Sequence, residues 1–328
     1  MTTTLDQTRT AAPAARRGRR RGRDGSRRLA ALLLAPTLLV LALVVGYPVL
    51  AGFRESLFAR GQGLDADGFV VQGDRFVGLD NYTAVFSGDR AEVFWNAFGN
   101  TTFFTVATVT LETLLGVGMA LIMHRAFRGR GLVRASVLVP WAIPTAISGL
   151  LWRWIFQADG AFNAVIRHQV LWTADGWPSR LAVVIAEVWK TSPFIGLLVL
   201  AGLQLIPREV HEAARVDGAT ALQRFWWITL PLVRPALLVA VLFRMLDALR
   251  MFDLPAVLIG VNKRSVETLT MLSWFEASNL RYGSAAAYAT ILFGYIALIA
   301  YLFVKLLGAD IIGEARQARR AARGKGKA

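Results

Sequence analysis

The chain has 328 residues, of which 55% are hydrophobic, and its formal net charge is +15. Its mean hydropathy of +0.46 indicates a polytopic, all-α integral membrane protein, because a soluble domain of this size is seldom so apolar. Several nearly uncharged runs approach the ~20 residues that a helix needs to cross a bilayer, and the alternating strands of a membrane barrel do not occur. Cysteine is missing, which excludes disulfides, thiolate metal sites and cysteine nucleophiles.

Residues 1–28 are a basic tail with nine arginines and almost no apolar side chains, a composition that predicts disorder. The charge favours a cytoplasmic N-terminus, and the arginines are not interleaved with aromatic residues as in a nucleic-acid-binding segment. The apolar run at about 29–53 exceeds the ~7–15 residues of a signal-peptide core. It is therefore predicted to be an uncleaved first span, which opens a membrane domain at 29–308.

Five further apolar segments are each long enough to be a membrane span. They are expected at about 97–123, 133–156, 181–203, 235–259 and 283–307. Pro140 and Pro144 predict a kink or break in the third span. The longest loop, 54–97, is expected to hold a short helix near Asn81 to Phe86, and a second basic tail follows at 309–328.

The 37 Lys and Arg residues are distributed unevenly between alternate loops. Residues 1–28, 124–134, 204–234 and 305–328 together hold 24 of them, whereas the loops at 54–97, 157–180 and 260–283 hold nine. The positive-inside rule then predicts six spans with both termini in the cytoplasm. The loop at 204–234 faces the compartment that contains ATP.

Charged residues lie within the expected fourth and fifth spans. Glu187 and Lys190 are spaced to pair along one helix, as are Asp247 with Arg244 or Arg250. A charge at the bilayer centre costs on the order of 2.5–3.5 kcal/mol, so such side chains face a bundle interior or a water-filled path. Two interpretations remain open: ion pairing that only fixes helix register, and pairing that also lines a path.

Two other sets of side chains also have both a structural and a functional interpretation. Threonines at 101, 105 and 108 share one face of the second span with Glu112. The threonines are interpreted as donors of hydrogen bonds between helices rather than as the wall of a wet cavity. For Glu112 both roles stay open. Trp152 and Trp154 in the third span suit either anchoring at the membrane interface or a platform for a sugar.

A polar island separates the fourth and fifth spans, in the loop at 204–234. It combines one acid with small residues, a helix-stop signal and a proline that marks the return to an apolar run: Glu212, Ala213, Ala214, Asp217, Gly218, Leu230 and Pro231. It has no nucleophile and no metal-ligand cluster, and the chain has no G-x-x-x-x-G-K-[ST] motif. We interpret it as a docking element rather than an active site.

The island resembles the E-A-A-x-x-x-G loop, with its trailing I-x-L-P, of permease subunits of binding-protein-dependent ABC importers. Further segments resemble carbohydrate permeases of the maltose and glycerol-3-phosphate type: F-V-G-L-D-N-Y at 76–82, V-P-W-A-I-P at 139–144 and Phe252-Asp253. Residues 185–194 resemble disaccharide permeases, including trehalose importers. The resemblance covers about 29–308 and excludes both tails.

This resemblance implies a type I ABC importer permease, multi-pass in the cell (inner or plasma) membrane. It implies three kinds of protein partner besides the lipid bilayer: an exterior solute-binding protein, a second related permease and two cytoplasmic ATPase subunits. ATP and Mg would be used by the ATPase, so this chain is expected to be non-catalytic and to bind no cofactor or metal. Nucleic acid is not an expected partner.

The same resemblance implies roles for individual residues. Glu212 would contact a cleft of the ATPase, Ala213 and Ala214 would allow its close approach, Gly218 would permit the turn, and Pro231 would fix the return to the membrane. The implied cargo is a sugar, most specifically a disaccharide such as trehalose. Five residues are candidates for its path: Lys190, Arg244, Asp247, Trp152 and Trp154.

Two rival classes make different demands on the sequence. A secondary transporter or channel without an ATPase would couple by itself, typically through inverted repeats and broken helices around an ion site, and no convincing repeat is found. An intramembrane enzyme needs a nucleophile or metal constellation, which the sequence does not show. Co-purification with an ATPase separates the importer from both rivals.

Overall fold

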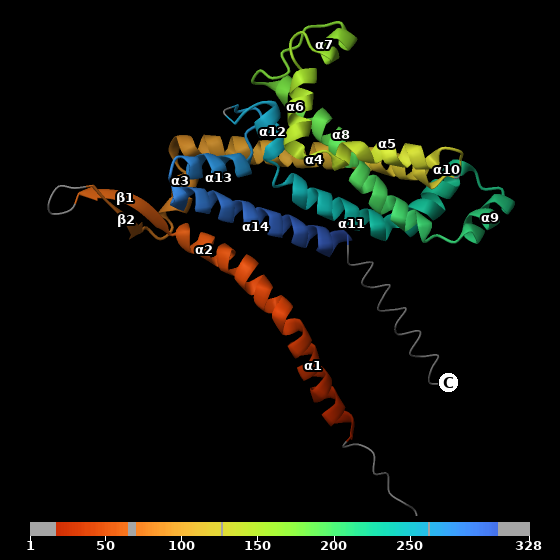
Figure 1. Cartoon of the computed structure of the whole chain (residues 1–328), viewed down its shortest axis with the longest axis horizontal. Helices are drawn as coiled ribbons and strands as arrows, with labels where there is room; N and C mark the ends of the chain where they lie inside the picture. Colours follow the sequence, from red (N-terminus) through yellow and green to blue (C-terminus); the bar gives the residue numbers. More distant parts are fainter. Residues whose placement is uncertain (1–17, 65–69, 126, 262, 308–328) are drawn as a thin grey trace, which may run out of the picture. The chain divides into compact units, whose positions relative to one another are not determined.

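The structure, a computed structural model, describes residues 18–64, 70–125, 127–261 and 263–307 and is mostly helical (Figure 1). The chain divides into two compact units, Met1–Arg54 and Glu55–Ala328. The first unit is one run of helix: α1 (Gly18–Leu41), a π-helical turn η1 (Ala42–Gly46) and α2 (Tyr47–Glu55). The expected first span is thereby confirmed as Leu29–Glu55, with none of its residues buried within the chain.

Helix α1 begins inside the basic tail that the composition predicts to be disordered. Residues from Gly18 onward are helical, in keeping with the high helix propensity of arginine, alanine and leucine. The rest of that tail, 1–17, and the C-terminal tail, 309–328, lie outside the described residues.

The second unit is built around four long helices. They are α4 (Gly88–His124), α8 (Trp177–Gln204), α11 (Leu230–Ala248) and α14 (Tyr282–Leu307). Helices α4, α11 and α14 run side by side, and α8 packs against both α4 and α11 (Figure 1). Six shorter helices connect or cover them: α3 (Asp80–Val85), α7 (Ala161–Ile166), α9 (Arg208–Val216), α10 (Ala221–Arg224), α12 (Asp253–Leu258) and α13 (Leu269–Ser278).

The third span is broken where its prolines predict a break. Helix α5 (Arg130–Ala142) is followed by α6 (Thr145–Ile155) at an angle of 95°. Pro144 is the N-cap residue of α6, and Pro140 lies in the last turn of α5. Within the described residues, five helices are long and apolar enough to span a membrane, or six if this bent pair counts as one span. The expectation of six spans is met in that sense.

The fifth span differs from the prediction at both ends. The helix begins at Ala221, not near 235, because α10 continues through a π-helical turn, η2 (Phe225–Thr229), into α11. Pro231 is the second residue of α11 and follows directly after that π turn. At the other end the helix stops at Ala248 and the chain restarts as α12, which places Pro255 in a first turn.

A two-stranded hairpin is the other departure from the all-α prediction. Strands β1 (Phe58–Leu64) and β2 (Val70–Phe76) pair antiparallel, with Phe58 opposite Phe76 and Gly61 opposite Gly73. The interspersed glycines hide the period-2 alternation that would have predicted strands. Asn81 of the correctly expected short helix α3 fixes the base of the hairpin, since its Nδ2 donates to the Phe58 carbonyl at 2.9 Å.

Polar side chains from α4 and α8 hold the segment that leads from α12 into α13. Arg180 donates to the Ser265 carbonyl at 2.9 Å and to Asn100 Oδ1 at 2.8 Å, and Asn100 donates in turn to the Arg264 carbonyl at 2.8 Å. Hydrogen bonds from the hydroxyl and the backbone N–H of Ser265 lower the pKa of the Asp175 carboxyl. This network ties three elements together at the end of the unit where α4 begins.

Glycines let α4 and α8 approach closely near the middle of the bundle. A Cβ added at Gly116 would lie 2.8 Å from the Cβ of Ile195 and 3.0 Å from the Ser192 carbonyl oxygen. At Gly118, two residues along the same helix, an added Cβ would meet nothing within 4 Å. Gly116, unlike Gly118, is therefore required for the close crossing, and small residues at such crossings are common in membrane helix pairs.

Gly116→Ala should lower the thermal midpoint of the purified protein, because overpacking at a tight contact costs about 1–3 kcal/mol. Gly118→Ala is the matched control, and it should be neutral or slightly stabilising because alanine favours helix over glycine. A melt monitored by circular dichroism in detergent measures both. Equal shifts for the two variants would contradict the assignment of the crossing to Gly116.

Candidate functional site

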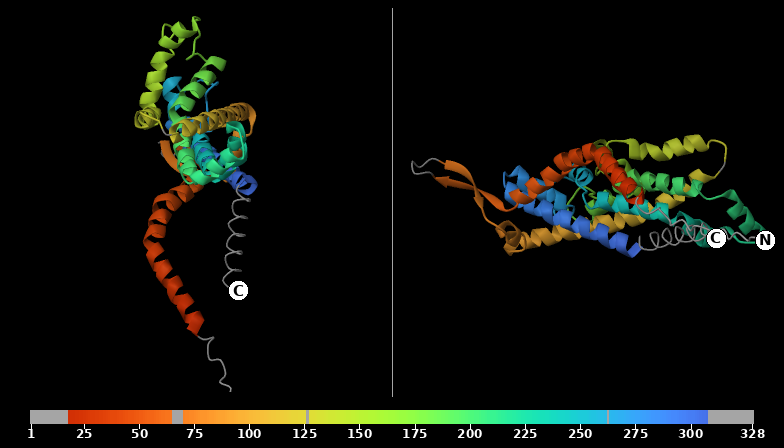
Figure 2. Two further views of the ribbon diagram at one scale, coloured as in Figure 1. Left: turned by 90° about the vertical axis from the view of Figure 1, so that its right-hand side faces the viewer. Right: turned by 90° about the horizontal axis from the view of Figure 1, so that it is seen from below.

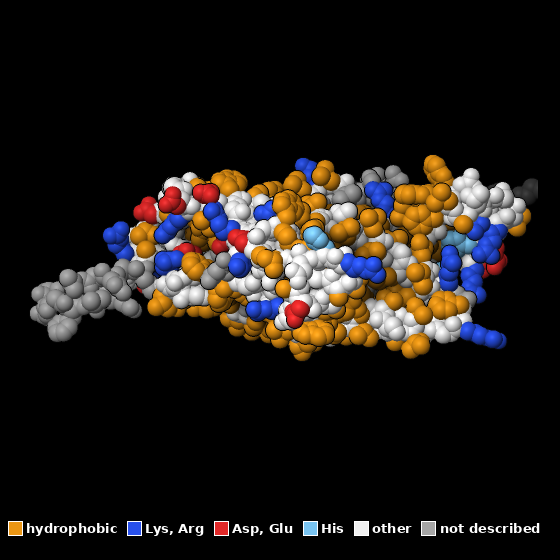
Figure 3. All heavy atoms as spheres, turned by 90° about the horizontal axis from the view of Figure 1, so that it is seen from above, with side chains coloured by type: hydrophobic (Ala, Val, Ile, Leu, Met, Phe, Trp, Pro, Cys, Tyr) orange, Lys and Arg blue, Asp and Glu red, His pale blue; other side chains and the backbone are white. Residues whose placement is uncertain are grey.

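Helix α9 carries the acidic and small residues of the proposed docking element. It lies at the end of the second unit opposite the β1–β2 hairpin (Figure 1, Figure 2). Glu212 and Ala213 are exposed, whereas Ala214 is buried within the chain. Lys and Arg side chains gather at this end of the face drawn in Figure 3, with hydrophobic side chains prominent between the two ends. The exposed residues of α9 therefore include two acids, Glu209 and Glu212, together with Arg208, Arg215 and Ala213.

The turn after α9 is a Schellman motif. Ala219 N–H donates to the Ala214 carbonyl at 2.9 Å, and Gly218 N–H donates to the Arg215 carbonyl at 3.1 Å. Gly218 has φ +79°, a left-handed conformation that a residue with a Cβ seldom adopts. The helix stop predicted at Asp217-Gly218 is present, with Asp217 exposed as the C-cap residue.

Leu230 and Pro231 are not in a loop, as the sequence suggested, but in the first turn of α11. Leu230 is half-buried and Pro231 is exposed. They follow η2 in the helix that begins at Ala221, and the turn at 217–220 separates that helix from α9.

Arg244 on α11 forms the centre of a buried charge cluster and is only 2% exposed. Its Nε and Nη2 donate to both carboxylate oxygens of Glu112 on α4, at 2.5 and 3.1 Å. Nη2 also donates to Glu187 Oε1 on α8 at 2.6 Å, and Nη1 donates to Asp247 Oδ2 at 2.9 Å. One guanidinium therefore joins three spans, using the planar fork of donors that distinguishes arginine from lysine.

The pairing expected between Glu187 and Lys190 is wrong. Within the described residues no ion pair joins the two. Glu187 instead forms an ion pair with Arg244 of a different helix. Lys190 is nevertheless buried, at 8% exposed, and its positive charge acts on Glu187 of the same helix without forming an ion pair with it. The alternatives for Asp247 both hold, since it pairs with Arg244 and, at 3.8 Å, with Arg250.

The exposure of the path candidates separates them into two groups. Asp247 and Trp154 are each 64% exposed on the described chain. Arg244 and Lys190 are buried, and Trp152 is half-buried against Phe156, with its indole Nε1 hydrogen-bonded to none of the described residues. Asp247 offers carboxylate oxygens, and Trp154 offers a ring face, to another molecule.

Glu112 was the residue whose role the sequence left open, and it completes the cluster. It is fully buried, and the Thr191 hydroxyl donates to its Oε1 at 2.6 Å. Its signal in the sequence was an acid on a threonine-bearing face of a long apolar helix. What could not be read was its partner, because Arg244 is 132 residues away.

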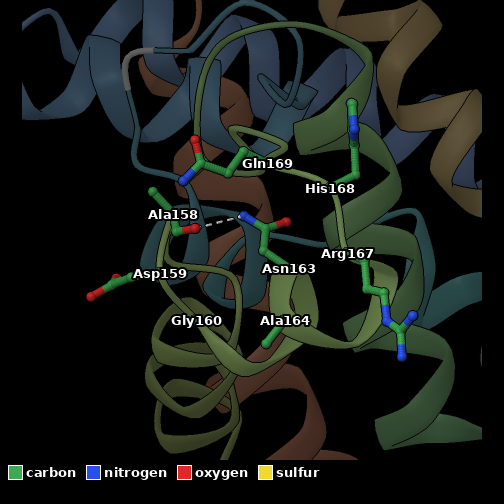
Figure 4. Close-up of a pocket in the computed structure, with 8 residues that line it drawn as sticks. All are labelled: Ala158, Asp159, Gly160, Asn163, Ala164, Arg167, His168 and Gln169. Carbon is green, nitrogen blue, oxygen red and sulfur yellow. Dashed lines mark hydrogen bonds between the residues drawn. The ribbon is translucent and has the colours of Figure 1, made fainter.

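A pocket of about 260 Å³ beside α7 has a structural explanation (Figure 4). Asn163 donates to the Ala158 and Val170 carbonyls, both at 3.0 Å, and accepts from Trp172 Nε1 at 2.8 Å. The Arg167 side chain points away from Asn163 (Figure 4). These contacts stabilise the loop between α6 and α8 and do not assemble a chemical site.

Arg244→Met should destabilise the protein by about 3–5 kcal/mol, because it leaves Glu112 and Glu187 buried without their cation. Arg250→Met is the matched control on the same segment and should change stability by less than about 1 kcal/mol, as for an exposed pair. Chemical denaturation of the purified protein in mixed micelles measures both. A similar loss for the two variants would refute the central position of Arg244.

Comparison with known proteins assigns the fold and the family. Residues 112–313 match the family described as binding-protein-dependent transport system inner membrane component. A chain from a bacterial ABC transporter involved in the import of the acidic polysaccharide alginate superposes with a TM-score of 0.72. That superposition covers 88% of this chain and 98% of the other at 19% identity, so it shows likeness of fold alone.

Two curated relatives match over nearly their whole length. The trehalose transport system permease protein of Mycobacterium tuberculosis is 39% identical over 294 residues, which is 89% of this chain and 92% of that protein. The trehalose/maltose transport system permease protein of Thermococcus litoralis is 38% identical over 285 residues, which is 85% of this chain and 93% of that protein. The chain belongs to the family of binding-protein-dependent transport system inner membrane components and is a multi-pass permease of the ABC transporter class.

Proposed function

We propose that this chain is one of two related permeases in an ATP-driven sugar importer and forms half of its translocation path. The observation that carries the proposal is the 39% identity to a trehalose permease over 92% of that protein's length. The described structure adds an exposed acid on a short helix, α9, which a turn at 217–220 connects to the helix of the fifth span. These features support a membrane subunit that takes its energy from a partner.

The partners follow from the proposed cycle. A loaded solute-binding protein docks on the exterior loops, and two cytoplasmic ATPase subunits bind ATP and Mg. This chain is non-catalytic and binds neither cofactor itself. Glu212 and Ala213 of α9 are exposed and would contact the ATPase, and the buried Ala214 supports the helix from within.

The face of α11 that carries Asp247 favours a transport path over a lipid contact. Asp247 lies within the span, and Arg250 lies just beyond the end of the span at Ala248. Both side chains are 64% exposed on this chain. Charges at membrane depth normally face a bundle interior or water. Asp247 can accept hydrogen bonds from sugar hydroxyls, and Arg244 fixes its position. The relatives' names suggest a disaccharide such as trehalose as the cargo.

A secondary transporter or channel is the second candidate, because a buried cluster of opposite charges also occurs in ion-coupled carriers. Such a protein would transport without α9. Removing the exposed features of α9 therefore separates the two candidates.

Glu212→Ala and Gly218→Asp should abolish ATP-driven sugar uptake by the reconstituted complex while membrane insertion stays normal. Glu212→Ala removes the polar contact, and Gly218→Asp places a side chain where φ is +79°. Gly131→Asp, at an exposed glycine at the start of α5, is the matched control and should leave uptake unchanged. Uptake of labelled disaccharide into proteoliposomes loaded with ATP measures all three. Normal uptake by both α9 variants would rule out the coupling role.

A further inference from the structure

The junction between α9 and α10 is held by hydrogen bonds beyond the Schellman turn. Thr220, the N-cap residue of α10, forms a capping box with Gln223: Thr220 N–H donates to Gln223 Oε1 at 2.8 Å, and Gln223 N–H donates to Thr220 Oγ1 at 3.3 Å. Arg224 Nη1 then reaches back to the Ala219 carbonyl at 2.6 Å. Three consecutive elements are therefore fixed relative to one another: the end of α9, the turn and the start of α10.

Helix α10 has only four residues, which is too short to be stable as an isolated helix. Its geometry depends on how it begins and on the helix that follows. The Thr229 hydroxyl donates to the Arg224 carbonyl at 3.2 Å across the π-helical turn η2, which secures the second junction. The capping box and the bond from Arg224 to the Ala219 carbonyl thus connect the turn after α9 to the start of the long helix.

The helix that starts at this junction leads directly to the buried cluster. Ala221–Ala248 is continuous over 28 residues. At 1.5 Å per residue it is about 42 Å long. Arg244 lies one turn before its end and is bound to Glu112 on α4 and Glu187 on α8. A rotation of α9 that the junction transmits would therefore reach three spans at once.

We propose that Thr220, Gln223 and Arg224 are positioning residues for energy coupling: they hold α9 at a fixed angle to the α10–η2–α11 helix, so that movement of α9 moves the Arg244 cluster. The inference rests on the proposed docking of α9 on an ATPase. The three residues act through the geometry of the junction. Loss of the junction should leave ATP hydrolysis intact and reduce the transport that each hydrolysis event drives.

The test uses the reconstituted complex and compares Thr220→Val with Thr220→Ser. Valine keeps the β-branched shape and removes the capping hydroxyl, whereas serine keeps the hydroxyl. Thr220→Val should lower the number of sugars transported per ATP by about fivefold. This is the change in the equilibrium constant of helix formation that corresponds to the loss of one N-cap. Thr220→Ser should retain the ratio of the unaltered protein, and both variants should bind the ATPase in normal amounts. An unchanged ratio in Thr220→Val, or equal losses in both variants, would overturn the positioning role.

A distance measurement tests the junction without ATP coupling. The chain has no native cysteine, so spin labels can be placed by Glu209→Cys on α9 and Leu232→Cys on α11, both exposed positions. The distance distribution should be narrow with Thr220 or Thr220→Ser and broad with Thr220→Val. Gln223→Leu removes only the bond from Thr220 N–H to the exposed Gln223 side chain. It provides a second variant if Thr220→Val does not assemble. The distance distribution should be broad in this variant too.

The two proposals fail in different ways. If the ATPase does not associate with the unaltered permease, the docking role of α9 is wrong. If the ATPase associates, but the capping-box variants show the same distance distribution and the same number of sugars per ATP as the unaltered protein, the docking role stands. The positioning role is then wrong.

Discussion

The contact of Arg244 with two buried glutamates constrains the rest of this permease. A guanidinium that is 2% exposed is stable inside a bundle only if carboxylates surround it, and Glu112 and Glu187 supply them from α4 and α8. The three spans must therefore hold one register, because a shift of one residue on any of them would bury an unpaired charge. The close approach at Gly116 brings α4 and α8 near enough for this pairing, and α11 completes it.

The Arg244 cluster is connected to α9 through one long helix. Arg244 and the capping box at Thr220 lie on one continuous helix, so the two features cannot move independently. A flexible loop at this place would dissipate the movement of a docked helix. The Schellman turn at Gly218 and the bond from Arg224 to the Ala219 carbonyl make the junction stiff. On the proposed docking of α9, an element with no chemistry of its own would thereby drive a change in the spans.

Sequence reasoning recovered what local pattern and composition encode. Hydropathy located the spans, Pro140 and Pro144 predicted the break between α5 and α6, and Asp217-Gly218 predicted the end of α9. It failed where a partner far along the chain decides the outcome. Glu187 was assigned to Lys190, three residues away, because periodicity reveals neighbours on one helix but not the arginine that an adjacent helix brings. The start of the fifth span was not predicted correctly because Pro231 and Pro235 suggest a helix boundary. The π-helical turn that precedes them has no sequence signal of its own.

The central claim is that energy enters through a partner bound at α9 and reaches the path through the helix that carries Arg244. The most direct test is uptake of a labelled disaccharide by proteoliposomes that contain the complete complex and its solute-binding protein, with ATP and with a non-hydrolysable analogue inside. The account predicts uptake only with hydrolysable ATP, with no effect when ionophores collapse proton and sodium gradients. Uptake by this chain without the ATPase, or uptake driven by an ion gradient alone, would contradict it.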